Sequence, residues 1–259
     1  MLSKNKIKLI HSLEKKKYRT EEGLFVAEGP KMMEELLAVW QPVYVAATEE
    51  WMMNNGETLR LSGKDAASFS KTCDVISQEE LERASLLRSP QQVIGLFRIP
   101  TEAVSLPDIA AKELCLALDG VQDPGNIGTI VRLADWFGIK HVFCSPDTAD
   151  IFSPKAVQAT MGAIARVRVH YIDLASELKA CKAPIYGTHL DGEDIYKKTL
   201  TAHGVIIMGN EGKGVSREVS EHVNSRLFIP PYPAERDKVE SLNVAIATAI
   251  VCAEFRRRS

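Results

Sequence analysis

The segment between residues 205 and 254 constrains the fold more than any other part of the chain. Val205 to Met208 is an apolar run with the length of a buried strand, and it ends at the sequence GNEGKG, residues 209–214. A second apolar run spans residues 227–229, and Ser241-Leu242-Asn243 opens an apolar helical run. Because glycines permit backbone angles closed to other residues, such a loop can approach a ligand closely. The order of strand, glycine loop, strand, polar turn and helix predicts a ligand-binding α/β domain.

The glycine loop does not fit the common nucleotide-binding fingerprints. A phosphate-binding P-loop needs G-x-x-x-x-G-K-[ST], and here Gly212-Lys213 is followed by Gly214 without that spacing. A dinucleotide fingerprint needs G-x-G-x-x-G, whereas the order here is G-x-x-G-x-G. Glu211 in the loop would repel a polyphosphate but not a ligand with a cationic centre. Read alone, the loop also fits a tight turn that binds nothing.

The distribution of charge is more informative than the net charge of -2. Between Met1 and Arg19 there are seven Lys or Arg residues against one Glu. Basic arms on a near-neutral protein are typical of a nucleic-acid binder that must release its product, although solvated terminal charges are an equal alternative. The four residues of this segment that we expect to contact RNA are Lys15, Lys16, Lys17 and Arg19.

The five cysteines form no C-x-x-C pair, and most lie within apolar runs. This pattern favours reduced core cysteines in a cytoplasmic protein and no metal site. The first residues are rich in lysine without an apolar core behind them, so we expect no secretory signal. The longest apolar run near the end, Val244 to Ala253, is too short to span a bilayer, and no membrane partner is expected.

The pattern of apolar runs predicts two domains, residues 1–100 and 108–259, joined by a proline-containing linker. The first alternates strands and helices as a small α/β domain. In the second, a strand at residues 114–118, a helix that Asn126 could cap and a strand at residues 141–144 form a β-α-β unit, which implies a parallel sheet. We expect six strands there, with helices on both faces of the sheet.

Four polar residues stand out as candidates for chemistry. Arg132 lies within a helix, where a surface ion pair with Asp135 is the simpler interpretation. Ser241 and Asn243 are polar residues at the start of an otherwise apolar helix, and Ser241 could serve as its N-cap. Glu211 lies within the glycine loop. The six histidines follow no nucleophile motif, and we find no carboxylate pair for hydrolysis.

Three motifs in order resemble those of the SpoU/TrmH family, the S-adenosylmethionine-dependent RNA ribose 2′-O-methyltransferases of the SPOUT class. They are N-x-G-x-x-x-R at residues 126–132, G-N-E-G-x-G at residues 209–214, and I-P at Ile229 followed by S-L-N-V at residues 241–244. The resemblance covers about residues 112–257. KKKYRTEEGLFVAEGPK, residues 15–31, also resembles the small substrate-binding domain of that family.

The resemblance implies a deep trefoil knot that forms the pocket for S-adenosylmethionine, and a homodimer in which both protomers contribute to each active site. The catalytic residues that it implies are Asn126, Arg132, Glu211, Ser241 and Asn243. The cofactor-binding residues that it implies are Thr188, Leu190, Met208, Gly209, Asn210, Gly214, Ile229, Pro230, Leu242 and Val244.

The chemistry suggests a division of roles among these residues. The pKa of an arginine, above roughly 12, makes it a poor proton acceptor, so we expect Arg132 to clamp the phosphate beside the reacting ribose. We expect Glu211 to hold either Arg132 or the Asn126 loop. The ribose 2′-hydroxyl is then oriented by Asn126, Ser241 and Asn243. The sequence departs from the family after Ile229, where PPYPAERDKVE replaces a shorter loop with a glycine.

The sequence therefore predicts an RNA 2′-O-methyltransferase, and its added N-terminal domain favours ribosomal over transfer RNA as the substrate. A transfer-RNA 2′-O-methyltransferase is one alternative. A non-catalytic RNA-binding protein of the same fold, or a methyltransferase acting on a base nitrogen, are the others. Loss of cofactor binding would mark the non-catalytic protein, and mapping of the methylated product would identify the base methyltransferase.

Overall fold

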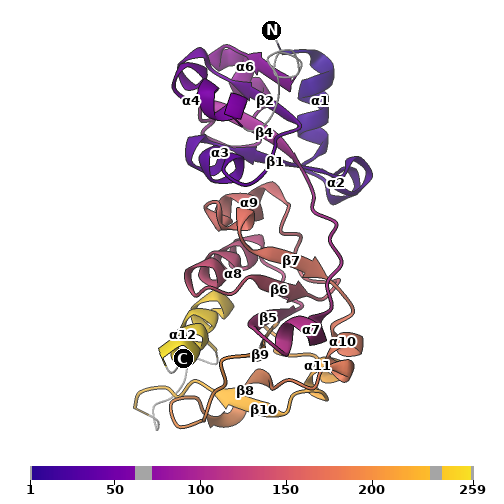
Figure 1. The fold of residues 1–259 in the computed structure, drawn as a ribbon, viewed down its shortest axis with the longest axis vertical. Helices are drawn as coiled ribbons and strands as arrows, with labels where there is room; N and C mark the ends of the chain where they lie inside the picture. The colour runs from indigo at the N-terminus through magenta and orange to yellow at the C-terminus, as the bar shows by residue number, and fades with distance from the viewer. Residues whose placement is uncertain (1, 62–71, 234–240, 258–259) are drawn as a thin grey trace. The chain divides into compact units, whose positions relative to one another are not determined.

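The computed structural model describes residues 2–61, 72–233 and 241–257, and it divides into two compact units (Figure 1). The first unit comprises Met1–Thr101 and Asp150–Ala165, and the second comprises Glu102–Ala149 and Arg166–Ser259. Residues 150–165 therefore cluster with the first unit, although they lie within the second predicted domain. The predicted boundaries at residues 100 and 108 stay a prediction.

The first unit is built on a four-stranded mixed sheet in the order β1-β4-β2-β3. β4 pairs antiparallel with both β1 and β2, and β2 pairs parallel with β3. One side of the core contains Ile10, Leu13, Tyr44 and Ile94, all buried. The elements of this unit are α1 (Lys4–Ser12), α2 (Lys16–Glu22), β1 (Leu24–Glu28), α3 (Pro30–Leu37), β2 (Tyr44–Ala47), α4 (Glu49–Leu61), β3 (Cys73–Val75), α6 (Gln78–Ala84), β4 (Val93–Arg98), α9 (Pro154–Thr160) and the 3-10 helix η1 (Ala163–Ala165).

The second unit contains a six-stranded sheet in the order β10-β8-β9-β5-β6-β7, and every neighbouring pair is parallel. This confirms the predicted parallel α/β sheet. The central strands β5 and β9 are buried along their whole length, as expected where helices cover both faces of a parallel sheet. Its elements are α7 (Leu106–Ala110), β5 (Leu114–Asp119), α8 (Pro124–Trp136), β6 (His141–Cys144), β7 (Arg168–Tyr171), α10 (Leu174–Ala180), β8 (Ile185–Asp194), β9 (Gly204–Gly209), α11 (Arg217–Ser220), β10 (Ser225–Phe228) and α12 (Val244–Arg257).

The N-cap predicted for α8 is wrong. The cap is Asp123, whose Oδ1 accepts a hydrogen bond from the backbone amide of Asn126 at 2.9 Å. Pro124 at the first helical position favours this start, because its missing N–H would have no partner within the helix and its φ suits a helix. Asn126 lies in the first turn instead, which leaves its side chain available for other contacts.

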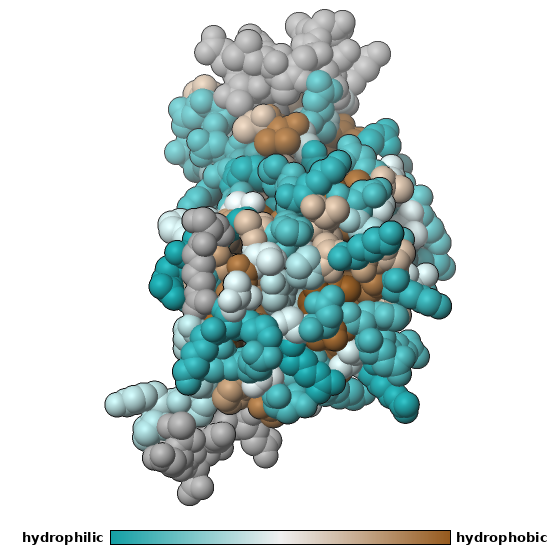
Figure 2. Space-filling model, turned by 60° about the horizontal axis from the view of Figure 1, so that its bottom comes forward, coloured by the Kyte–Doolittle hydropathy of each residue, from teal (hydrophilic) through white to brown (hydrophobic). Residues whose placement is uncertain are grey.

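Hydrophilic residues predominate on the face that Figure 2 shows, and hydrophobic residues form small patches there. Within the described ranges, no helix is long and apolar enough to cross a membrane. The same ranges contain no cluster of three or more His, Cys, Asp or Glu side chains arranged to hold a metal ion. All five cysteines are free thiols.

Candidate active site

The carboxyl ends of β8, β9 and β10 meet at one edge of the sheet, because these three strands are parallel neighbours. Most of the predicted cofactor-binding residues belong to these strands or follow them directly: Thr188 and Leu190 lie in β8, residues 208–210 span the end of β9, and Ile229 and Pro230 follow β10. Ligands of open parallel sheets bind in the crevice outside the carboxyl ends of the strands. The candidate site therefore lies at the edge of the sheet where open parallel sheets bind their ligands.

The glycine loop after β9 folds back on itself. Asn210 and Gly214 exchange two backbone hydrogen bonds of 2.9 Å, and the Asn210 side chain caps the turn by accepting from the amides of Gly212 and Lys213 at 3.0 Å. A Cβ at Gly209 would stand 2.2 Å from the carbonyl carbon of Gly214. The loop thus requires glycine at 209 for a close approach of its own backbone.

The strand β8 carries a wide bulge at the same edge. Gly187 pairs with Arg226 of β10, but the next pairing joins Leu227 to Glu193, so five residues of β8 bypass the ladder. Thr188 and Leu190 lie in this bulge. Thr188 donates a hydrogen bond to the carbonyl of Ile207 at 3.2 Å, whereas Leu190 is 77% exposed.

The segment after β10 leads to α12. Ile229 and Pro230 are half-buried, and Leu242 is 51% exposed, whereas Met208 and Val244 are buried. Residues 234–240 of the atypical loop lie outside the described residues. The proposed N-cap at Ser241 is wrong, because the cap of α12 is Asn243, whose Oδ1 accepts from the amides of Ala245 at 2.9 Å and Ile246 at 3.2 Å.

Three of the predicted catalytic residues form one hydrogen-bonded chain. Asn126 Nδ2 donates to Glu211 Oε1 at 2.8 Å, and Asn243 Nδ2 donates to Asn126 Oδ1 at 3.0 Å. Glu211 also accepts from the backbone amides of Gln122 at 3.3 Å and Asp123 at 3.4 Å. Of the two roles considered for Glu211, the structure therefore supports the one in which it holds the Asn126 loop.

The environment of Glu211 keeps its carboxyl group ionised. Partial burial raises its pKa, but hydrogen bonds from the Asn126 side chain and from the amides of Glu211, Gln122 and Asp123 outweigh that effect and leave the pKa below its usual value. Glu211 is therefore an acceptor at neutral pH and is unsuited to the role of general acid.

Arg132 and Ser241 are exposed, and neither has a hydrogen bond or an ion pair to this chain of contacts within the described residues. The alternative in which Arg132 pairs with Asp135 is wrong. Asp135 binds Arg166 instead, with Arg166 Nη2 2.8 Å from Asp135 Oδ2. The guanidinium of Arg132, on α8 two turns beyond Asn126, is thus available to an external anion.

A buried layer beneath the site was not identified from the sequence. Gly120, at φ 70°, donates its amide to Ser145 Oγ at 2.9 Å and Thr148 Oγ1 at 3.1 Å, and its carbonyl accepts from Asn210 Nδ2 at 2.7 Å. Asp119 Oδ2 accepts from the amide of Ser216 at 2.6 Å. These contacts tie the loops after β5, β6 and β9 together. In the sequence, the Asp119-Gly120 pair at the end of a strand signals a turn, and this was the available indication of the buried layer.

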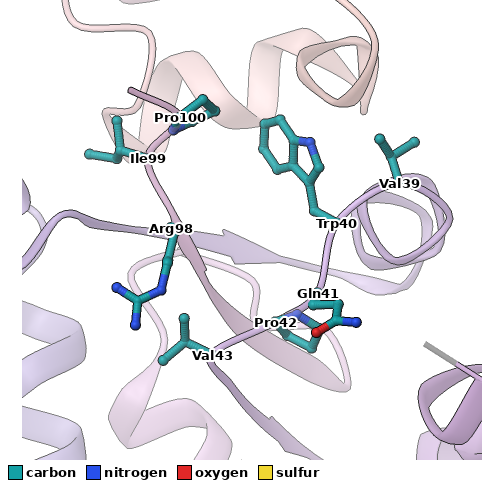
Figure 3. A pocket seen from close by; sticks show the side chains of 8 residues that line it. All are labelled: Val39, Trp40, Gln41, Pro42, Val43, Arg98, Ile99 and Pro100. Carbon is teal, nitrogen blue, oxygen red and sulfur yellow. The ribbon is translucent and has the colours of Figure 1, made fainter. Parts of the chain in front are cut away.

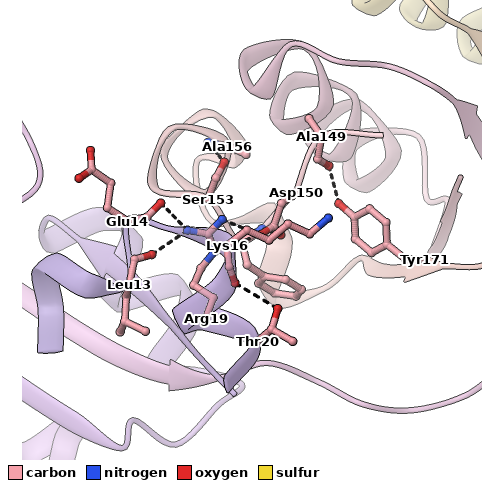
Figure 4. Close-up of polar contacts among 11 residues, drawn as sticks. Leu13, Glu14, Lys16, Arg19, Thr20, Ala149, Asp150, Ser153, Ala156 and Tyr171 are labelled. Atoms are coloured by element: carbon pink, nitrogen blue, oxygen red, sulfur yellow. Dashed lines mark hydrogen bonds and ion pairs between the residues drawn. The ribbon is translucent and has the colours of Figure 1, made fainter. Parts of the chain in front are cut away.

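The basic segment of the first unit separates into two kinds of residue. Lys15, Lys16 and Lys17 are exposed, whereas Arg19 is 3% exposed. Figure 4 shows the guanidinium of Arg19 among Leu13, Glu14 and Asp150. The guanidinium donates to the backbone carbonyls of Leu13 and Glu14, each at 2.7 Å, and it forms an ion pair of 2.6 Å with Asp150. The prediction that Arg19 contacts RNA is therefore corrected, because its donors are used inside the protein.

The residues at the carboxyl edge fit a cofactor such as S-adenosylmethionine. Leu190 and Leu242 are large apolar side chains in solvent, and they suit an adenine ring or an aliphatic chain. The ionised Glu211 is compatible with a positively charged sulfonium nearby. Residues 211–214 of the glycine loop are exposed, so the loop lies at the surface of this edge.

Comparisons with known proteins identify the family of this chain. Residues 113–253 match the model of the SpoU rRNA methylase family, and residues 4–95 match the MRM3-like substrate binding domain. The chain is 31% identical over 255 residues to the 23S rRNA (guanosine(2553)-2'-O)-methyltransferase RlmP of Bacillus subtilis (strain 168), covering 97% of this chain and 96% of that protein.

Two solved structures match over the whole chain. A TrmH-family protein from Porphyromonas gingivalis has a TM-score of 0.86 and 39% identity, with 100% of each chain covered. An AdoMet-bound rRNA methyltransferase from Sinorhizobium meliloti has a TM-score of 0.85 and 28% identity, with 100% of this chain and 96% of that chain covered. With its three motifs joined at the carboxyl edge of a parallel sheet, this chain belongs to the SpoU rRNA methylase family.

Proposed function

We propose that the protein transfers a methyl group from S-adenosylmethionine to a ribose 2′-hydroxyl of 23S ribosomal RNA. The observation that carries the proposal is the chain of hydrogen bonds from Asn243 through Asn126 to Glu211, which joins the three motifs of the family at one edge of the sheet. The full-length match to RlmP supports ribosomal RNA as the substrate.

The cofactor supplies a methyl group that its sulfonium already activates. The protein must therefore align the ribose hydroxyl for attack and help to remove its proton. Arg132 clamps the phosphate beside that ribose, and its exposure and its lack of a partner among the described residues support this role. Ser241 and the amide groups of Asn126 and Asn243 orient the hydroxyl, while Glu211 holds the Asn126 loop. Main-chain groups of Gly209, Ile229 and Leu242 bind the cofactor.

The remaining assignments complete this proposal. The first unit binds RNA through Lys15, Lys16 and Lys17, which are exposed cations beside one another. The chain acts as a homodimer in the cytoplasm, and the exposed Trp136 and Ile246 support the dimer because they lie on the mutually packed helices α8 and α12. The C-terminal helix threads through a loop to form a deep trefoil knot, which makes the cofactor pocket.

The decisive experiment is transfer of labelled methyl from S-adenosylmethionine to unmodified ribosomal RNA, followed by digestion to nucleosides. Label on a 2′-O-methyl nucleoside is the expected result. Label on a base nitrogen, or no transfer to any ribosomal RNA by a protein that binds the cofactor, would reject the proposal.

The variant Arg132→Ala tests the clamp. We expect loss of turnover with cofactor affinity, measured by calorimetry, nearly unchanged. Arg217→Ala removes an exposed arginine of the same unit that pairs with Glu221, and it serves as the matched control. If Arg132→Ala abolished cofactor binding as well, the phosphate clamp would be the wrong role.

A further inference from the structure

The last turn of α12 carries an arginine that is bound to the end of a different helix. Arg256 Nε donates a hydrogen bond to the backbone carbonyl of Phe137 at 2.7 Å, and Arg256 Nη2 donates to the carbonyl of Gly138 at 3.2 Å. Phe137 is the C-cap of α8, and Gly138 follows it at φ 64°. The carbonyls at a helix C-terminus lack partners within the helix and carry partial negative charge, so a guanidinium suits them on both counts.

The opposite ends of the same two helices are joined as well. Asn243, the N-cap of α12, donates to Asn126 in the first turn of α8 at 3.0 Å. Both helices therefore begin at the candidate active site and run side by side in the same direction (Figure 1). α8 has 13 residues and α12 has 14, so each is about 20 Å long. Two helices of matched length are thus hydrogen-bonded at both ends.

Between these ends the buried side chains of α12 are mostly apolar. They include Val244, Thr248, Val251, Cys252 and Phe255. Burial of apolar surface is non-directional, so it holds a helix in place without fixing its exact tilt or its position along a neighbour. Hydrogen bonds depend on angle as well as distance, and those at the two helix ends restrict both the tilt and the sliding of α12 on α8.

The length of the helices links their far ends to the active site. A tilt of about 3° moves the end of a helix about 20 Å long by about 1 Å. The hydrogen bond from Asn243 to Asn126 is 3.0 Å long, and a displacement of that size would take it outside the normal range. Because a misplacement of about 1 Å can lower a reaction rate by about a hundredfold, a small movement of α12 is sufficient to disturb the alignment of the ribose hydroxyl.

We propose that Arg256 is a positioning residue for methyl transfer. It fixes the tilt of α12 on α8, and it thereby holds Asn243 against Asn126 at the active site without touching the reacting groups. A planar guanidinium suits this role, because two of its N–H groups reach the carbonyls of consecutive residues. This inference rests on the proposed function, since it assigns a further residue to the same reaction.

The first test is single-turnover methyl transfer at saturating cofactor and RNA, at a temperature well below the thermal midpoint of each variant. Arg256→Gln should lower the rate about tenfold or more, while the KM for RNA stays within about twofold of the wild-type value. Arg256→Lys keeps the positive charge but offers no planar fork, so it should recover part of the rate. A purely structural role would lower the thermal midpoint and leave this rate unchanged.

Two variants serve as matched controls, and both should keep the wild-type rate. Arg257→Gln removes the next arginine of α12, which pairs with Glu254 of its own helix at 2.8 Å. It perturbs the same helix end without changing the contact of Arg256 to α8. Arg98→Gln removes an exposed arginine of the first unit, from the lining of a pocket of about 490 Å³ (Figure 3), and tests the loss of one positive charge.

A double-mutant cycle shows whether Arg256 acts through Asn243. Asn243→Ser keeps a residue that can cap α12, but its side chain is too short to replace the contact with Asn126. In a protein that already carries Asn243→Ser, Arg256→Gln should change the rate by less than about twofold. Equal effects of Arg256→Gln in the two backgrounds would overturn the positioning role, because independent sites contribute additively.

The outcomes separate this inference from the proposed function. A wild-type protein that methylates ribosomal RNA, with Arg256→Gln at the same rate, would overturn the inference and leave the function intact. Loss of rate that sedimentation velocity traces to a change of assembly would overturn it as well. A wild-type protein that binds the cofactor but methylates no ribosomal RNA would reject the function and the inference together. If Arg256→Gln fails to fold by circular dichroism, Arg256→Lys and its cycle with Asn243→Ser decide the matter.

Discussion

Asn126 donates its side-chain amide to Glu211 at 2.8 Å, although 85 residues separate the two positions in the chain. The side-chain oxygen of Asn126 accepts a hydrogen bond from Asn243, 117 residues away. One amide thus fixes the relative positions of three segments, the start of α8, the glycine loop and the start of α12. An acceptor on one side and a donor on the other also fix which way the Asn126 amide points.

Glu211→Gln should lower methyl transfer at saturating substrates by about ten- to a hundredfold, because hydrogen bonds to a charged group contribute roughly 1.5–3 kcal/mol. The side-chain NH2 group of the new glutamine would face the backbone amides of Gln122 and Asp123, which need an acceptor. Single-turnover kinetics measure the effect, and Glu218→Gln, an exposed acid on α11, is the matched control. Equal rates for the two variants would show that Glu211 does not position the loop.

The stabilisation that Glu211 provides should disappear in acid. Its pKa in the folded protein lies below the value of 4.5 for the free side chain, so its contribution is complete above pH 4.5 and is lost as the pH falls through the folded pKa. We expect the difference in thermal midpoint between wild type and Glu211→Gln to stay constant from about pH 7 to about pH 5 and then to shrink. A difference that grew on acidification would contradict the lowered pKa.

Gly209→Ala should disrupt the glycine loop and abolish measurable cofactor binding, because the new Cβ would stand 2.2 Å from backbone carbon and 2.3 Å from backbone nitrogen. Overpacking of this kind costs about 1–3 kcal/mol or more. Gly212→Ala is the matched control in the same loop, since the nearest atom to its Cβ would be 3.7 Å away. Calorimetry with S-adenosylmethionine and thermal unfolding compare the two variants.

Arg19→Ala should destabilise the first unit by roughly 3–5 kcal/mol, because it leaves the Asp150 carboxylate without its buried partner. Lys17→Ala removes an exposed cation that lies 3.9 Å from Glu21, and it should cost less than about 1 kcal/mol. Denaturant unfolding gives both values. For RNA affinity we expect the opposite, with a larger loss in Lys17→Ala than in Arg19→Ala. A folded Arg19→Ala protein that lost more RNA affinity than Lys17→Ala would show that Arg19 contacts RNA.

Trp136→Glu should convert the proposed dimer into a monomer, since Trp136 is 83% exposed on α8 and Ile246 is 55% exposed on the adjacent α12. A charge in an apolar contact carries a large desolvation cost. Met53→Glu, which alters an exposed apolar residue of the first unit, is the control and should leave the mass unchanged. Sedimentation velocity at several concentrations distinguishes these outcomes.

Local patterns in the sequence were sufficient to predict the elements and the family. Ser153 before Pro154 caps α9, Ser77 and Glu80 form a capping box at the start of α6, and Ser216 caps α11. These signals involve residues within one turn of each other, so the chain need not be folded for them to be read. The six strands expected in the second half are all present, and they pair as one parallel sheet.

The order of strands and helices, the position of the glycine loop and the three motifs can all be read from the sequence. Which polar groups of these motifs meet depends on the tertiary fold. It made Asn243 rather than Ser241 the cap of α12, directed Asp135 to Arg166 rather than Arg132, and buried Arg19 against Asp150. Each of these choices depends on how the chain packs around the group, and propensity within one turn carries no information about that packing.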